Sequence, residues 1–83
     1  MSFFVYMILS NHKDKVLSYV GYTNNLELRL HKHNSNKGAK STKGYKWILI
    51  YSKKFVSKNE AMSYEYKLKK DKVLRKSILK KTK

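Results

Sequence analysis

One glutamate is the first candidate for chemistry in this sequence. Glu65 is one of only five acidic residues, and it shares a helical stripe with Ala61 and Leu68 that should face the protein interior. A carboxylate in such a position is costly unless it pairs with a cation or holds a metal ion. The spacing therefore leaves two interpretations open: a metal ligand, or a glutamate at the edge of the stripe that pairs with one of the many lysines.

Arg29 and His33 form a second candidate pair. They lie four residues apart in a predicted helix, so both side chains share one helix face. An arginine can grip a phosphate with two parallel hydrogen bonds, while a histidine one turn away can accept or relay a proton. The alternative is an ordinary exposed basic face. His31 and His33 do not predict a zinc pair, because residues two apart on a helix point about 200° apart.

Two tyrosines near the N-terminus could bring hydroxyl groups to one place. If the turn of a predicted hairpin centres on His12 and Lys13, Tyr6 falls opposite Tyr19, and a slip of one residue would break that pairing. A phenol that acts as a base needs a neighbouring cation or metal ion, because its ordinary pKa is about 10. The structural alternative is that both rings pack in the sheet, as tyrosine commonly does.

The net charge indicates a polyanionic partner. The 83 residues carry 20 lysines and arginines against five acids, which gives a formal net charge of +15. Since 41% of the residues are hydrophobic and 13% aromatic, the chain is too apolar for a disordered basic tail. We expect a folded domain that binds nucleic acid. A weaker alternative is an anionic membrane surface, contacted through the last helix.

Candidate contacts to a phosphate backbone lie in a polar loop and in the basic C-terminal stretch. Lys37, Lys40 and Lys43 alternate in loop 34–44 with hydroxyl groups such as that of Thr42, and side chains of these types contact phosphates. Lys69 lies in the stretch 67–83, which would attract a backbone without reading its bases.

The composition excludes several classes of protein. The chain has no cysteine, so a disulfide scaffold, a thiol nucleophile and a zinc–thiolate site are excluded. No apolar run reaches the roughly 18–20 residues of a membrane helix, and the apolar start lacks the basic segment and cleavage site of a signal peptide. We expect one domain over residues 1–83, a cytoplasmic location and no membrane partner.

The elements that must position these residues follow from the hydrophobic pattern. Asn25 and its neighbours offer a helix start, Ser57 with Glu60 matches a capping box, and Asp71 is suited to cap a last helix. The predicted strands are 3–10, 16–22 and 45–51, and the predicted helices are 26–33, one beginning at 57, and 72–80. The order β-β-α-β-α-α predicts an α+β fold, a small three-stranded antiparallel sheet flanked by helices.

Several short motifs, in order and spacing, resemble the GIY-YIG nuclease domain family. Phe4-Val5-Tyr6 and Tyr19-Val20-Gly21 are similar to the paired motif that names the family. The resemblance continues through residues 21–30, 33–35, 37–40, 60–61 and 65–70, nearly the whole chain. It is strongest toward small stand-alone bacterial members that consist of this domain only. Phe4 replaces a glycine of the motif and Val20 an isoleucine, which alters packing rather than reactive groups.

The resemblance implies a metal-dependent phosphodiesterase. In the family, the residues that correspond to Tyr6, Tyr19, Arg29, His33 and Glu65 form the catalytic site, and the glutamate holds the metal. We expect an endonuclease that hydrolyses phosphodiester bonds of nucleic acid, DNA rather than RNA, with one Mg²⁺ or Mn²⁺ ion. One acidic ligand fits a single ion better than a two-metal site.

Each expected residue has a role in that reaction. Glu65 would hold the ion, Arg29 would neutralise the charge that builds on the phosphate, and Tyr6 would activate water, with Tyr19 or His33 as the alternative base. The competing hypothesis is a non-catalytic basic module that binds DNA or RNA and in which Glu65 is merely structural.

Overall fold

The structure is a computed structural model that describes residues 2–12, 15–38 and 40–82. The strands are β1 (Phe3–His12), β2 (Lys15–Thr23) and β3 (Ile48–Phe55), and the helices are α1 (Leu26–Asn34), α2 (Lys58–Lys70) and α3 (Lys72–Thr82). A short 3₁₀ helix, Lys40–Thr42, precedes β3. The predicted α+β class and the order β-β-α-β-α-α are confirmed.

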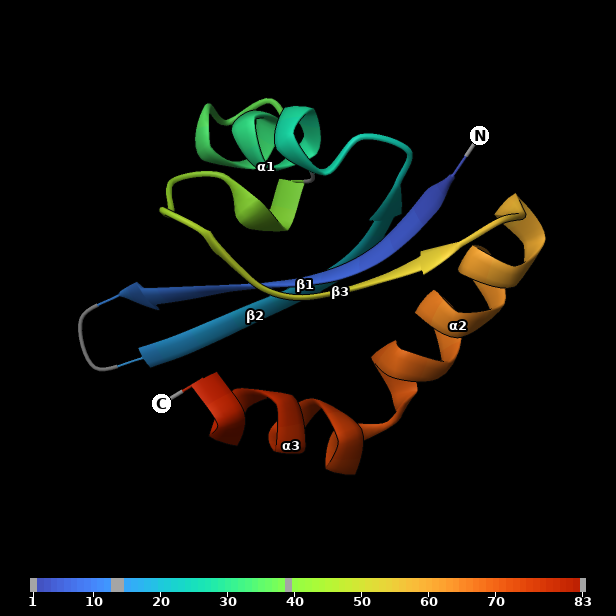
Figure 1. The fold of residues 1–83 in the computed structure, drawn as a ribbon. Coiled ribbons are helices and arrows are strands. Elements are labelled where there is room, and N and C mark those ends of the chain that lie inside the picture. Colours follow the sequence, from blue (N-terminus) through green and yellow to red (C-terminus); the bar gives the residue numbers. More distant parts are fainter. Residues whose placement is uncertain (1, 13–14, 39, 83) are drawn as a thin grey trace.

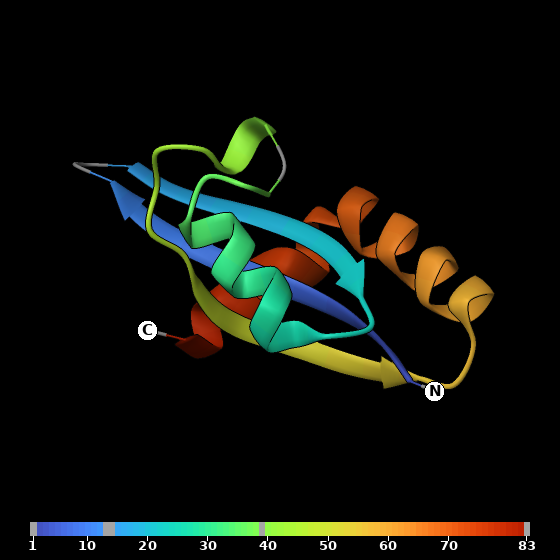
Figure 2. The same ribbon diagram turned by 90° about the horizontal axis from the view of Figure 1, so that it is seen from above.

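The central strand β1 supplies side chains to both layers of helices. The sheet is antiparallel with the strand order β2-β1-β3; α1 and the loop after it cover one face, while α2 and α3 cover the other (Figures 1 and 2). Because successive side chains of a strand point to opposite faces, Val5 and Met7 pack toward α2 and α3, and Tyr6 and Ile8 pack toward α1.

The hairpin register differs by two residues from the expected one. Tyr6 lies opposite Gly21, so the expected pairing of Tyr6 with Tyr19 is wrong. The physical reason is space, because a Cβ at Gly21 would lie 2.5 Å from the hydroxyl oxygen of Tyr6. A shift of two residues keeps Tyr19 on the same face as Tyr6, diagonally across the strands. The expected centre of the turn includes Lys13, which lies outside the described residues.

The third strand begins and ends later than expected, at Ile48 and Phe55 rather than at 45 and 51. Asn34 binds both backbone groups of Trp47: its Oδ1 accepts from the Trp47 N–H at 2.6 Å, and its Nδ2 donates to the Trp47 carbonyl at 3.0 Å. These hydrogen bonds occupy the backbone groups of Trp47, so the pairing of β3 with the sheet begins only after this residue. The strand then continues to Phe55, which pairs with Phe3, because an edge strand tolerates exposed lysines.

Side chains cap all three helices at the predicted starts: Asn25 for α1, Ser57 for α2 and Asp71 for α3. The predicted apolar stripe of α2 is confirmed, since Ala61 and Leu68 are both 0% exposed in the core beneath the sheet. Within the described part of the chain, none of the helices combines the length and the apolar character needed to cross a membrane.

Candidate active site

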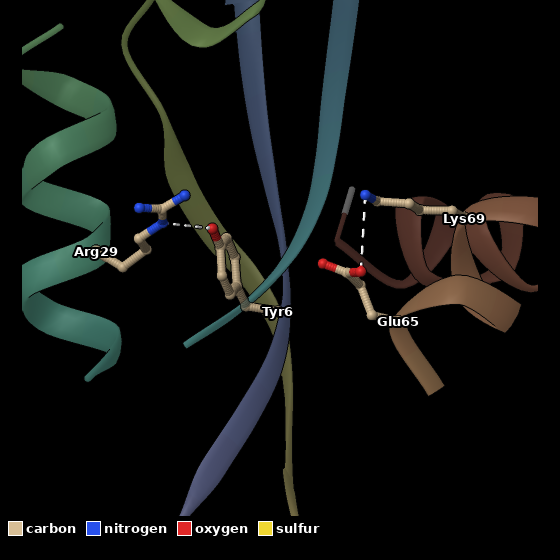
Figure 3. A network of polar contacts seen from close by, with 4 residues as sticks. All are labelled: Tyr6, Arg29, Glu65 and Lys69. Carbon is tan, nitrogen blue, oxygen red and sulfur yellow. Dashed lines mark hydrogen bonds and ion pairs between the residues drawn. The ribbon is translucent and has the colours of Figure 1, made fainter. Parts of the chain in front are cut away.

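Tyr6 lies at the centre of a buried polar cluster on the α1 face of the sheet. Its hydroxyl accepts a hydrogen bond from Nε of Arg29 at 3.3 Å (Figure 3). The same hydroxyl is 2.7 Å from Nε2 of His33. Tyr6 is 2% exposed and His33 is 0% exposed. Tyr19 joins them, with its ring centroid 6.5 Å from that of Tyr6 and 5.0 Å from that of His33. The sheet and α1 thus bring four of the five expected catalytic residues together.

The local structure of α1 explains why two of these side chains meet one hydroxyl. The cap at Asn25 sets the start of the helix, and the spacing of four residues then places Arg29 and His33 on one face. That face packs on β1, so both reach Tyr6. The prediction of a shared face is confirmed, and the alternative of an exposed basic face is wrong because His33 is buried.

Thr42 holds His33 from the opposite side of the ring. Its Oγ1 is 2.9 Å from Nδ1 of His33, and its carbonyl accepts a hydrogen bond from Nε1 of Trp47 at 3.0 Å. A Cβ at Gly38 would lie 2.5 Å from the same Nδ1, so the glycine makes room for the imidazole. Thr42 is 0% exposed, which corrects its expected role as a phosphate contact. The sequence spacing could not predict the contact between His33 and Thr42, because the two residues belong to different elements that share no period.

The surroundings determine where the protons of the cluster reside. Burial raises the pKa of Tyr6, although the hydrogen bond and charge of Arg29 act in the opposite direction. Burial, and then the charge of Arg29, lower the pKa of His33. Because arginine can only donate, the Tyr6 hydroxyl accepts from Arg29. In the tautomer of neutral His33 that carries its proton on Nδ1, the phenol donates to Nε2 and the Nδ1–H donates to Thr42. The hydrogen bond to Tyr6 raises the pKa of Arg29, which stays charged.

Glu65 lies on the other side of the sheet from this cluster. Figure 3 shows its carboxylate turned toward the strands, across from Tyr6 and Arg29. Its side chain is 19% exposed, and its Oε1 is 3.7 Å from Nζ of Lys69. The pairing with a lysine, one of the two interpretations of Glu65, is therefore present. After burial and the neighbouring Tyr19, the Glu65 carboxylate is a further cause that raises the pKa of Tyr6.

The donor set around Glu65 restricts the kind of metal it could hold. In the ranges that the structure describes, no group of three His, Asp or Glu side chains comes together. Glu65 is paired there through Oε1, on the side of Lys69. Magnesium is commonly bound by one or two carboxylates, with substrate phosphates and waters as its remaining ligands, whereas zinc takes three or four protein ligands. The residues present fit a hard divalent ion.

A polar hollow of about 390 Å³ opens beside Arg29. We call it the Arg29–Lys58 hollow; its lining residues are Phe3, Tyr22, Thr23, Asn24, Arg29 and Lys58. Arg29 belongs to α1 and Lys58 to α2, which cover opposite faces of the sheet. The hollow therefore lies at the end of the sheet and is lined by residues from both the α1 side and the α2 side.

The lysines expected to contact nucleic acid are all exposed. Lys37, Lys40 and Lys43 belong to the loop on the α1 side of the sheet, and Lys69 lies on α2 beside Glu65. Both sides of the candidate site thus carry positive charge at the surface.

Comparison with known proteins is consistent with this geometry. A model of the GIY-YIG catalytic domain matches residues 2–77. A UPF0213 protein of Oceanobacillus iheyensis is 48% identical over 65 residues, 77% of this chain and 74% of the relative. One from Staphylococcus haemolyticus is 46% identical over 65 residues, 77% and 78% of the two chains. The solution NMR structure of a UPF0213 protein from Bacillus halodurans is 38% identical, with a TM-score of 0.51, and the match covers 100% of this chain and 86% of that one.

Proposed function

Because this chain belongs to the GIY-YIG catalytic domain family, we propose that it hydrolyses phosphodiester bonds of nucleic acid with the help of one divalent metal ion. The family is one of nucleases, and a net charge of +15 suits a nucleic-acid substrate. Within the proposal, the substrate is DNA rather than RNA and the cleavage is endonucleolytic. The observation that carries it is the buried hydroxyl of Tyr6, which contacts both Arg29 and His33.

In this proposal Tyr6 and His33 act in series as the base. A water molecule at the Tyr6 hydroxyl passes a proton to that oxygen while the phenol proton moves to Nε2 of His33, 2.7 Å away. Throughout the step, the proton on Nδ1 stays on that nitrogen and remains hydrogen-bonded to Oγ1 of Thr42. His33 is 0% exposed, so it acts through Tyr6 and does not touch the substrate. Tyr19, which is half-buried, is the alternative base.

Arg29 is placed to neutralise the charge that builds on the phosphate. Its Nε is bonded to Tyr6, while the side chain also lines the open hollow, so one guanidinium reaches both the base and the solvent-accessible side. Glu65 is the residue that would hold the metal. Mg²⁺ or Mn²⁺ bound there would supply Lewis-acid polarisation of the scissile phosphate.

A cleavage assay with labelled single- and double-stranded DNA and RNA, in Mg²⁺, Mn²⁺ or EDTA, tests the proposal. We expect cleavage of DNA that needs the metal, and a rate lower by about 100-fold or more in Glu65→Gln and in Arg29→Ala. Glu27→Gln is the matched control, because it removes an exposed carboxylate from α1. Thermal unfolding of each variant separates loss of activity from loss of the fold.

The competing function, a basic module that binds without cutting, predicts a different pattern. In that case the protein binds the same oligonucleotides tightly, cleaves none of them in either metal, and binds equally well after Glu65→Gln. Such a result would overturn the proposal.

A further inference from the structure

The Arg29–Lys58 hollow contains a second cation, Lys58, that hydrolysis at a single phosphate does not explain. Two of its lining residues, Arg29 and Lys58, are cations. None of the residues that line it in the described part of the chain is acidic. Asn24 adds an exposed amide, while the hydroxyl of Thr23 accepts the N–H of Asn25 at 3.1 Å and so stabilises the bend that leads from β2 into α1. Paired positive charges in a polar recess are suited to an anion.

The position of Lys58 relates this hollow to the proposed metal ligand. Lys58 and Glu65 lie seven residues apart on α2, so they project from nearly the same side of the helix, about 10 Å apart along its axis. Arg29 faces the hollow from α1 and contacts Tyr6 through its Nε. Because Arg29 and Lys58 line the same hollow, a strand with one phosphate at Arg29 would lead a neighbouring phosphate toward Lys58.

We propose that the Arg29–Lys58 hollow binds the phosphate next to the one that is cleaved, with Lys58 as its own charged contact. This inference rests on the proposed function and extends it, since the ligand is a phosphodiester monoanion of the substrate strand. A lysine contributes a point charge without directional geometry. Lys58 therefore strengthens binding of the strand and does not enter the chemistry, so its removal raises KM and leaves kcat within about twofold.

The first test measures binding without cleavage. The affinity of the protein for a short single-stranded oligonucleotide is measured in EDTA at several salt concentrations, for the wild type, Lys58→Ala and Lys15→Ala. Lys15 is an exposed lysine at the start of β2, at the opposite end of that strand from the hollow, so its variant loses the same charge elsewhere. We expect the slope of log affinity against log salt to fall in magnitude by about 0.7 for Lys58→Ala only, the value for one lost contact to a single strand. Equal slopes in the two variants would overturn the inference.

The second test locates the contact along the strand. In a cleavable DNA, one phosphate at a time is replaced by an uncharged methylphosphonate on either side of the cleavage site. We expect wild type to show a raised KM when the phosphate adjacent to the cleavage site is neutral, and Lys58→Ala to show no further rise there. If Lys58→Ala responds to every substitution as wild type does, the hollow does not bind that phosphate.

The two tests distinguish failure of this inference from failure of the proposed function. A wild-type protein that cleaves nothing contradicts the nuclease proposal, while the salt slopes still report on the hollow. A wild-type protein that cleaves normally, with matching slopes for Lys58→Ala and Lys15→Ala, contradicts the inference alone. Thermal unfolding shows whether either variant has lost its fold.

Discussion

The two faces of the sheet use alternate residues of the same strand but bury opposite chemistries. The face toward α2 and α3 is apolar; its buried residues are Val5, Met7, Val20, Ala61, Leu68 and Ile78. The face toward α1 buries hydrogen-bonding side chains beside apolar ones, above all Tyr6, His33 and Thr42. The strand β1 thus lies between an apolar core on one face of the sheet and a hydrogen-bonded polar cluster on the other.

This difference predicts which residues determine the stability of the fold and which determine its activity. Apolar burial stabilises a fold without directional demands, whereas a buried polar group is tolerated only when its hydrogen bonds are made. In the cluster on the α1 face, the Tyr6 hydroxyl and both ring nitrogens of His33 have partners. Substitutions of the buried apolar residues on the face toward α2 and α3 should therefore lower the free energy of unfolding, and substitutions in the cluster should mainly lower activity.

The largest effect is expected for Tyr6→Phe, which removes the hydroxyl between Arg29 and His33. We expect the cleavage rate to fall by roughly 10²–10⁴-fold, the range for loss of a general base. The free energy of unfolding should fall by only about 1–3 kcal/mol, the cost of leaving one buried group without a partner. Tyr19→Phe is the matched control. A larger loss of activity in Tyr19→Phe than in Tyr6→Phe would assign the base to Tyr19 instead.

The apolar face is tested by Leu68→Ala. Because Leu68 is 0% exposed in the core between the sheet and the helices, we expect a loss of about 2–5 kcal/mol in the free energy of unfolding, measured with chemical denaturant. At a temperature where the variant remains folded, its cleavage rate should stay within a few-fold of wild type. Leu28→Ala, at a position 51% exposed, should leave stability almost unchanged. Loss of activity in fully folded Leu68→Ala would break the division between the two faces.

Gly21→Ala should disturb the cluster through crowding rather than through loss of a group. The new Cβ would lie 2.5 Å from the hydroxyl oxygen of Tyr6, so the ring must move away from Arg29 and His33. We expect a loss of about 1–3 kcal/mol in the free energy of unfolding, together with reduced cleavage. The stability cost should be smaller when Gly21→Ala is combined with Tyr6→Leu, because the hydroxyl oxygen and the ring carbons nearest to the new Cβ are then absent. Equal costs in both backgrounds would exclude this clash as the cause.

The smallest effect is a pH dependence of stability that comes from His33. Burial, and then the charge of Arg29, hold the pKa of His33 below its ordinary value in the folded protein, so the unfolded chain binds a proton more readily. The stabilisation is fully present above the ordinary histidine pKa of about 6.5 and is lost as the pH falls through the lower folded value. Thermal unfolding from pH 8 to pH 5 should show a steeper fall for wild type than for His33→Asn.

His31→Asn is the control for this pH dependence, because His31 is an exposed neighbour on the same helix. We expect its unfolding temperature to follow the wild-type curve. If His31→Asn, and not His33→Asn, flattened the curve, the protonation state assigned to the buried cluster would be wrong.

The sequence by itself predicted the features that depend on short spacing. Asn25, Ser57 and Asp71 cap their helices as expected, because capping involves residues only three positions apart. The shared face of Arg29 and His33, and the inward stripe of α2, likewise follow from the helical period. These relations belong to a single element and do not need the rest of the molecule.

Only the tertiary structure decided how those elements meet. A two-residue shift of the hairpin preserves the alternation of side chains, so the pattern could not distinguish Tyr6 opposite Tyr19 from Tyr6 opposite Gly21. The support of His33 by Thr42, and the hollow shared by Arg29 and Lys58, join segments with no common period. The position of Glu65 across the sheet from Tyr6 depends on which face each helix covers. Such contacts arise from the packing of layers, which sequence spacing does not encode.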